Sequence, residues 1–166
     1  FFKQKTAYEI HERLVGSGSD QLYDTSPHNL FPIVFDLLLS GGTPRINGDD
    51  YPTPDGTCVR DYVHVADLAR SHVAAAEQMM AGKKLEKAYN LGSGTGSSVR
   101  EIMDAIARVT GIAFTPEIAP RRPGDPARIV ARGDKAARDI DWKMRHSLDQ
   151  MVESAWNARR AHPQGA

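Results

Sequence analysis

Apolar residues recur at helical spacing in several stretches of the chain. Residues 29–39 form a mostly apolar stretch that ends at a Ser-Gly-Gly turn, and Pro32 falls in its first turn, where a helix tolerates proline. Ser98 and Glu101 have the spacing of a capping box ahead of another apolar, helix-spaced stretch. The pattern predicts helices over 29–39, 67–81, 98–109, 134–140 and 147–160, the last of which begins with the same capping-box spacing.

Short stretches rich in β-branched or aromatic residues lie between these helices. They predict strands over 45–47, 57–65, 88–91, 114–118 and 129–131. The segment 49–56 is dense in Pro, Asp and Gly and predicts turns. Because helices and strands alternate without an internal repeat, the chain is expected to form an α/β or α+β unit rather than a helical array.

The predicted strand 57–65 carries the strongest chemical signal. Alternation places Val59, Val63 and Val65 on one face and Arg60, Tyr62 and His64 on the other. Asp61 falls on the valine face, where a carboxylate is costly unless it accepts hydrogen bonds, so we expect the fold to pair it. Arg60 has a planar fork of donors that suits a phosphate, but an arginine on a strand is more often a solvated or paired surface residue.

Residues 1–17 are treated separately from the rest. The strings KQKTAYEI (3–10) and RLVGS (13–17) resemble translated sequencing adapters, so residues 1–17 are expected to be a non-native leader and the protein to begin near Gly18. The alternative is an amphipathic helix, with Ala7, Ile10 and Leu14 at helical spacing. Residues 18–166 are then expected to be one functional unit.

Composition excludes several classes of protein. Lys plus Arg and Asp plus Glu are equal, at 21 each, so no overall field attracts the chain to nucleic acid or to an anionic membrane. The longest apolar stretch, 30–39, is shorter than the roughly 18 residues of a membrane span. The single Cys58 allows no internal disulfide and no Cys/His metal spacing, which suits the cytoplasm.

A long run of motifs resembles a known enzyme family. The sequence DDYPTPDGTCVRDYVHVADLA (49–69) is similar to the signature of UDP-glucose 4-epimerases, which belong to the extended short-chain dehydrogenase/reductase superfamily. The similarity continues through YNLGSGTGSSVREI, APRRPGDPA and AWNARRAHPQG, and covers residues 29–166. The resemblance implies the carboxy-terminal, substrate-binding portion of an NAD-dependent epimerase fold that lacks most of the Rossmann sheet.

The resemblance also implies a set of substrate-binding residues. Arg60 and Arg122 are expected to hold the diphosphate of a UDP-sugar, and Asp125 to contribute to the same nucleotide pocket. The other members are Asn29 and Leu30 at a helix start, and Arg45, Ile46 and Asn47 on the strand along which uracil lies. The chain departs from the family pattern at Asn47, where members often have an aromatic residue, and at Ile129, where some have a tyrosine that contacts the substrate.

The catalytic part of such an enzyme is missing from the sequence. The family oxidises the sugar at C4 with NAD and returns hydride to the other face, using a Tyr-x-x-x-Lys base that none of the tyrosines here provides. We therefore expect no catalytic and no NAD-binding residue in this chain. The resemblance implies a cytoplasmic homodimer acting on UDP-glucose and UDP-galactose, and an apolar face exposed around 29–39 where the absent sheet docks.

Two other functions remain open, together with several weaker features. The alternatives are another nucleotide-sugar epimerase, dehydratase or decarboxylase of this superfamily, and a nonenzymatic nucleotide-binding module. The stretch 92–96 follows a strand and opens a helix, but its spacing is GxGxG rather than GxGxxG, so a tight turn explains it better than a dinucleotide site. The remaining features are read as packing: buried Cys58, core or boundary His72, Met79, Met80, Trp142 and Trp156.

Overall fold

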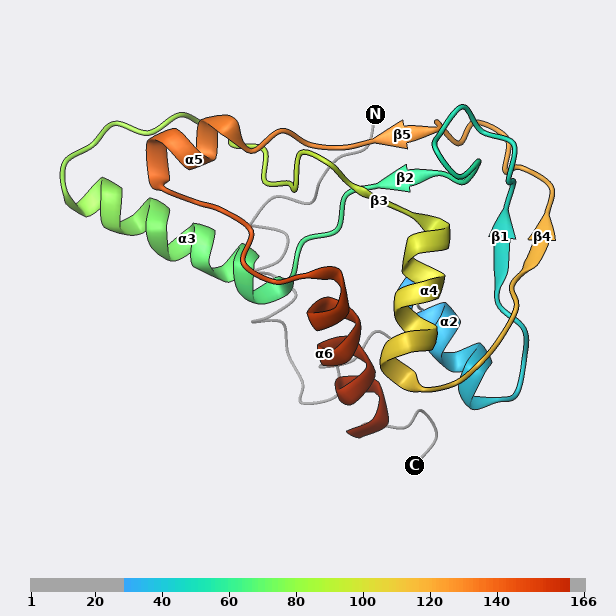
Figure 1. Ribbon diagram of the computed structural model, residues 1–166. Coiled ribbons are helices and arrows are strands. Elements are labelled where there is room, and N and C mark those ends of the chain that lie inside the picture. Colours follow the sequence, from blue (N-terminus) through green and yellow to red (C-terminus); the bar gives the residue numbers. More distant parts are fainter. Residues whose placement is uncertain (1–28, 162–166) are drawn as a thin grey trace, which may run out of the picture.

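The computed structural model describes residues 29–161, and its two small groups of strands lie along the top and the right of Figure 1, with the helices below them and to the left. The expected leader 1–17 lies outside these residues. The helices are α2 (Leu30–Leu39), α3 (Val65–Met80), α4 (Val99–Thr110), α5 (Asp134–Ile140) and α6 (Leu148–Ala161). The strands are β1 (Arg45–Asn47), β2 (Val59–Arg60), β3 (Ser97–Ser98), β4 (Glu117–Ala119) and β5 (Arg128–Ile129). No helix within 29–161 is both long and apolar enough to cross a bilayer.

The larger core lies between α2, α4 and α6. Helix α4 buries Ile102, Met103 and Ile106 almost completely, as its helical spacing predicts. Its capping box forms, since the Ser98 side chain accepts from the Glu101 amide while the Glu101 carboxylate accepts from the Ser98 amide. Trp156 of α6 is buried in this core, which confirms the expectation for that residue.

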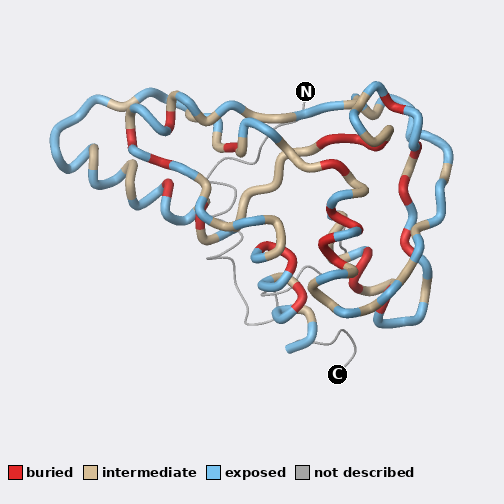
Figure 2. Tube along the Cα trace, in the orientation of Figure 1, coloured by how far each residue is buried: buried red, intermediate tan, exposed pale blue. Residues whose placement is uncertain are grey.

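A second, smaller core joins α3 and α5 on the other side of the molecule, and the buried residues of Figure 2 separate into these two groups. Ala136, Ile140 and Trp142 form its centre, so Trp142 is also buried as expected. Two other packing expectations are wrong. Met79 and Met80 are 63% and 89% exposed, and His72 is exposed with Nδ1 2.8 Å from the Leu68 carbonyl.

The strands form two small sheets. β1 pairs in parallel with β4, and β2 lies between antiparallel β3 and parallel β5. The prediction for 45–47 is confirmed, whereas the strands predicted over 114–118 and 129–131 are shorter and shifted by one to three residues. The predicted strand 88–91 does not form, because within the described residues no strand lies alongside it to complete a ladder.

The predicted strand 57–65 is wrong in extent, since only Val59 and Arg60 pair as β2. Helix α3 begins at Val65, which is 74% exposed rather than in the valine face, because the His64 side chain caps the helix by accepting from the Ala66 amide. The alternation of side chains expected for a strand therefore ends after Arg60, where side-chain hydrogen bonds to the backbone replace strand pairing.

Candidate functional site

A cavity of about 1380 Å³ collects most of the residues that the sequence assigns to substrate binding. It is lined by parts of α2, β1, β2 and α6 and by the loop after β4. The predicted residues in its wall are Asn29, Leu30, Arg45, Asn47, Arg60, Arg122 and Asp125. Ile46 is the exception, because the whole residue is only 1% exposed and packs in the larger core. Ile46 therefore does not line the cavity, although Arg45 and Asn47 on either side of it do.

Arg60 is held firmly in the cavity wall. Its Nη1 donates to the Val59 carbonyl at 2.9 Å and to the Pro126 carbonyl at 2.8 Å. Its Nη2 lies 3.4 Å from Asp125 Oδ1, and only 23% of the arginine side chain is exposed. These contacts leave the guanidinium little rotamer freedom, so Arg60 is preorganised to present its remaining N–H groups.

Arg122 and Asp125 are joined by the turn between them. The Asp125 amide donates to the Arg122 carbonyl at 3.2 Å, and Gly124 has a φ of +81°. A Pro-Gly pair with positive φ at the glycine is typical of a type II turn, which accounts for Pro123 and Gly124 at these positions. The turn sets Arg122 beside the Arg60–Asp125 pair.

Asn47 contributes to the position of Arg122. With its amide oriented so that Oδ1 faces the guanidinium, Asn47 accepts from Arg122 Nε at 3.1 Å and from Nη2 at 3.3 Å. Among residues 29–161 Arg122 forms no ion pair, so a neutral amide holds it and its charge stays uncompensated. Asn47, which stands where family members often have an aromatic residue, thus helps to orient the Arg122 guanidinium towards the cavity.

The neighbouring Arg121 has a different role. Its Nε lies 2.5 Å from Asp50 Oδ1, and its guanidinium stacks 4.2 Å above the Tyr51 ring. The hydrogen bond to Arg121 lowers the pKa of Asp50. Burial, followed by the nearby Cys58 thiol, raises the pKa of Tyr51. Arg121 therefore fastens the 49–56 turn, while Arg122 faces the cavity.

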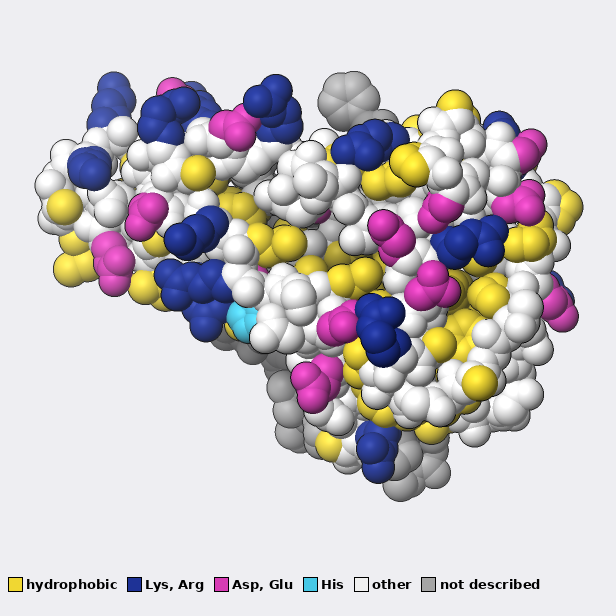
Figure 3. Space-filling model, in the orientation of Figure 1, with side chains coloured by type: hydrophobic (Ala, Val, Ile, Leu, Met, Phe, Trp, Pro, Cys, Tyr) yellow, Lys and Arg dark blue, Asp and Glu magenta, His cyan; other side chains and the backbone are white. Residues whose placement is uncertain are grey.

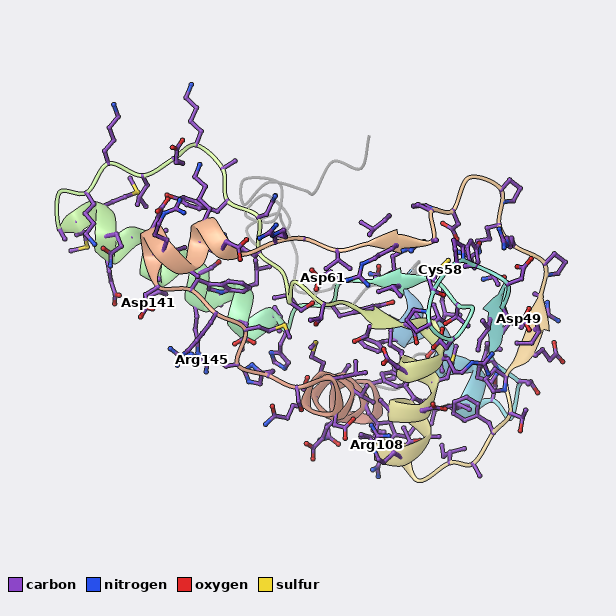
Figure 4. The ribbon with its side chains drawn as sticks, turned by 45° about the horizontal axis from the view of Figure 1, so that its top comes forward. Asp49, Cys58, Asp61, Arg108, Asp141 and Arg145 are labelled. Carbon is purple, nitrogen blue, oxygen red and sulfur yellow. The ribbon has the colours of Figure 1, made fainter. Side chains whose placement is uncertain are left out.

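Asp61 is paired by the fold, as the sequence predicts. It accepts from the Ser93 amide at 3.0 Å, from Ser93 Oγ at 2.7 Å and from the Ala131 amide at 2.9 Å. In Figure 4 it lies where β2 leads towards α3. A Cβ on Gly92 would come within 2.2 Å of this carboxylate, which explains the glycine without a ligand. Asp61 is thus a structural anchor.

The glycine-rich loop does not offer a phosphate cradle. The Gly94 amide donates to the Ala131 carbonyl, and the Thr95 and Gly96 amides donate to Ser93 Oγ. Since Asp61 takes the Ser93 amide, every amide from 93 to 96 has a partner inside the fold. A dinucleotide diphosphate needs free amides in such a loop. The described residues therefore do not fit NAD at this loop.

The other part of the cavity is apolar and was missed from the sequence. Phe31 packs against Tyr62 with ring centroids 5.5 Å apart, and burial raises the pKa of Tyr62. Helix α6 adds Ser154, Ala155 and Ala158 to the wall. Small residues at helical spacing mark such a face, but the sequence does not say what it faces. The cavity thus combines a cationic region with an aromatic and apolar one, which suits an anionic ligand that has a flat ring.

Comparison with known proteins agrees with this chemistry. Residues 10–92 match the NAD dependent epimerase/dehydratase family. The chain is 44% identical over 146 residues to a UDP-glucose 4-epimerase of Halalkalibacterium halodurans, and 49% identical over 110 residues to one of Corynebacterium glutamicum. These alignments cover 86% and 66% of this chain but 43% and 33% of the relatives.

Solved structures give the same result. A crystal structure of a UDP-glucose 4-epimerase superposes with a TM-score of 0.78 at 42% identity, over 84% of this chain and 43% of that one. The Stenotrophomonas maltophila UDP-glucose 4-epimerase, with bound NAD and formylated UDP-arabinopyranose, superposes with a TM-score of 0.80 at 38% identity. That match covers 88% of this chain and 44% of the other. The chain spans less than half the length of these relatives.

Proposed function

Because the chain belongs to the NAD dependent epimerase/dehydratase family, we propose that it is the substrate-binding part of a UDP-glucose 4-epimerase. The whole enzyme interconverts UDP-glucose and UDP-galactose, and this part holds the nucleotide. The observation that carries the proposal is the meeting of Arg60 and Arg122 in one cavity, with the charge of Arg122 uncompensated. Charge-assisted hydrogen bonds from two guanidiniums suit the adjacent phosphates of a diphosphate.

Two regions of the cavity are proposed to bind two different parts of the ligand. The arginines and Asp125 take the diphosphate and a neighbouring hydroxyl, while β1 and the aromatic and apolar wall take the uracil end. The amides of the glycine-rich loop 93–96 are occupied within the fold, so NAD binding and the hydride transfer are assigned to the remainder of the parent. Clamping the nucleotide leaves the hexose free to turn, which is a positioning role. A cytoplasmic homodimer remains part of the same proposal.

An apolar stripe on α3 supports the view that this chain is part of a larger protein. The exposed apolar positions 65, 69, 73, 76 and 80 follow one helical face. Val65, Val73 and Met80 in it are 74%, 58% and 89% exposed, and Figure 3 shows hydrophobic side chains along the edge of the α3 lobe. The expected apolar face on α2 is also present, but it lines the cavity. We assign the α3 stripe to contact with the remainder of the parent.

The test is to measure UDP binding by the full 166-residue chain. Binding is monitored through nuclear magnetic resonance chemical shifts as UDP is added up to millimolar concentration. Arg122→Ala is expected to weaken binding about 10- to 150-fold, since a charge-assisted hydrogen bond is worth about 1.5 to 3 kcal/mol. Arg121→Ala is the matched control, because it removes the same charge next to the cavity without lining it. Equal weakening by both variants, or none by Arg122→Ala, contradicts the proposal.

A second measurement concerns activity. Purified chain with added NAD and UDP-galactose is expected to give no UDP-glucose, because the sequence has no Tyr-x-x-x-Lys pair. Measurable turnover would contradict the assignment of catalysis to the missing part. A pea relative that is 38% identical is a bifunctional UDP-glucose and UDP-xylose 4-epimerase. Since the proposed arginine contacts are to the nucleotide only, the sugar is assigned by similarity to the UDP-glucose 4-epimerases among the relatives.

A further inference from the structure

The two cores of the molecule meet at a small polar junction that substrate binding does not explain. The junction lies between the start of α3, the segment 141–147 and α6. Asp67 of α3 is at its centre, and its side chain is 0% exposed. Its carboxylate accepts from the amides of Arg145 and His146 at 2.9 and 3.0 Å. Its backbone carbonyl accepts from Trp142 Nε1 at 2.8 Å.

Two histidines stack at this junction. The rings of His64 and His146 have centroids 4.0 Å apart and are inclined by 18°. His64 Nδ1 accepts from the Ala66 amide at 3.0 Å and so caps α3. Its Nε2 lies 2.8 Å from Ser154 Oγ of α6. The imidazole of His64 therefore joins the first turn of one helix to another helix.

The partners of His64 determine its protonation state. Ser154 Oγ donates its proton to the Met151 carbonyl at 3.1 Å, so it accepts from His64 Nε2–H. Nδ1 must be unprotonated because it accepts from the Ala66 amide. His64 is consequently neutral, with the proton on Nε2, and each ring nitrogen is committed to a different helix.

A second proton on His64 is unfavourable for two reasons. A proton on Nδ1 would point at the Ala66 amide, and two donors would then face each other in place of the cap. The added charge would also lie against the His146 ring. The Asp67 carboxylate lies 3.0 Å from Nδ1 of His146, the other ring of the stacked pair, although that contact is not aligned as a hydrogen bond.

We propose that the stacked pair His64–His146 is a pH-sensitive clasp that closes α6 onto the start of α3 at neutral pH and opens on acidification. His64 and Ser154 both line the cavity, so opening the clasp loosens one wall of it. The clasp couples the two cores through one imidazole. This inference does not depend on the identity of the ligand.

The charged groups around His64 agree with this direction. Burial lowers the pKa of His64 most, and the facing His146 lowers it further. On α3 itself, Asp67 raises the pKa and Arg70 lowers it, while Ser154 on α6 carries no charge. Because the folded-state pKa lies below the ordinary 6.5, the unfolded chain binds more protons as pH falls through that range. The closed state is thus most stable above pH 6.5 and weakens below it.

The test is hydrogen–deuterium exchange of the full chain, corrected for intrinsic rates, at pH 7.5 and 5.5. Protection in the first turn of α3 is expected to fall by up to about tenfold at the lower pH, which is the most that one linked proton with an open-state pKa of 6.5 allows. Amides at Ile102 and Ile106 in the larger core are the internal reference and should change less than about twofold. An equal loss of protection at Ile102 and Ile106 would mean that the whole chain unfolds, which would overturn the proposal of a local clasp.

Three variants make the test specific. His64→Asn keeps a side-chain cap but cannot titrate, so the response to pH should disappear. His72→Asn, on the same helix but exposed, is the matched control and should keep the full response. His146→Phe retains a stacked ring but removes the facing imidazole that lowers the pKa of His64, so the transition should move to higher pH. A response that persists in His64→Asn, is lost in His72→Asn or does not move in His146→Phe overturns the proposal.

Discussion

Replacement of Asp67 by Asn is predicted to destabilise the fold and to remove a defined part of its acid sensitivity. Two backbone amides of the segment 141–147 donate to this carboxylate, and Arg70 Nη1 lies 3.0 Å from it. Burial on its own raises the pKa of Asp67, but the amides of Arg145 and His146, together with the His146 side chain, outweigh it and bring the pKa from 3.8 to about 2. In Figure 4 Arg145 lies on this segment between α3 and α6.

The expected magnitude follows from that pKa. The gap between 3.8 and about 2, at about 1.36 kcal/mol per pH unit, corresponds to about 2.4 kcal/mol. Solvent screens the part of this that comes from the His146 side chain, which is 23% exposed, so about 2 kcal/mol is expected from the charge. Asn also sets an NH2 group against backbone donors, and the total loss is expected to be about 2 to 4 kcal/mol.

The pH dependence has a definite sign. Because the folded-state pKa of Asp67 is lowered, its contribution is fully present above about pH 4 and is lost as pH falls towards 2. Urea unfolding followed by Trp142 fluorescence in a Trp156→Phe background reports on this junction, since Trp142 donates to the Asp67 carbonyl. The stability of the wild-type chain should fall between pH 4 and 2 by about 2 kcal/mol more than that of Asp67→Asn.

Asp134→Asn is the control for this experiment, because its side chain is 70% exposed at the start of α5. Its free energy of unfolding should change by less than about 0.5 kcal/mol. The reasoning fails if Asp67→Asn costs no more than the control, or if both variants keep the same slope between pH 4 and 2.

Three further predictions follow from local geometry. Gly96→Ala should lower the free energy of unfolding by about 3 kcal/mol, because φ is +72° and the added Cβ would meet neighbouring atoms at 2.6 to 3.0 Å. Gly94→Ala is the control and should cost about 1 kcal/mol, because φ is +77° but the space around it is open. Equal urea midpoints for the two variants would contradict this. Ser98→Ala should remove about 1 to 2 kcal/mol by loss of the capping box, measured by thermal unfolding, and an unchanged melting temperature would refute it. Val73→Lys with Met80→Lys should change stability by less than about 0.5 kcal/mol and reduce self-association in sedimentation; clear destabilisation would show that the stripe is packed within the chain.

The helices were predictable because each carries its own signals. Helix α5 has the predicted bounds, α2, α4 and α6 differ from theirs by at most one residue at each end, and α3 begins two residues and ends one residue before its predicted bounds. The pairing of Asp61 was predictable for a similar reason, since a carboxylate on an apolar face has few stable alternatives. Local periodicity, caps and the cost of burying a charge are all readable from neighbouring residues.

The strands were less predictable because a strand depends on distant residues. β2 needs β3 and β5, which lie far along the chain, and it ends where Asp61 turns to the Ser93 amide. The exposed Met79 and Met80 show the same limit, because their apolar character marks a surface that the described residues do not cover. Sequence pattern indicates that a face is apolar but not which partner buries it.

The meeting of Arg60 and Arg122 depends on one backbone pairing. β2 and β5 align in parallel with Val59 opposite Arg128, which brings the Pro126 carbonyl to Arg60 Nη1. The turn that ends at Asp125 then returns Arg122 towards the same point. A parallel pair requires a long crossover, here the whole segment that contains α3 and α4, so its register cannot be read from two short strands. The resemblance in sequence supplied the two residues, and the pairing of β2 with β5 supplies the physical reason that they share a cavity.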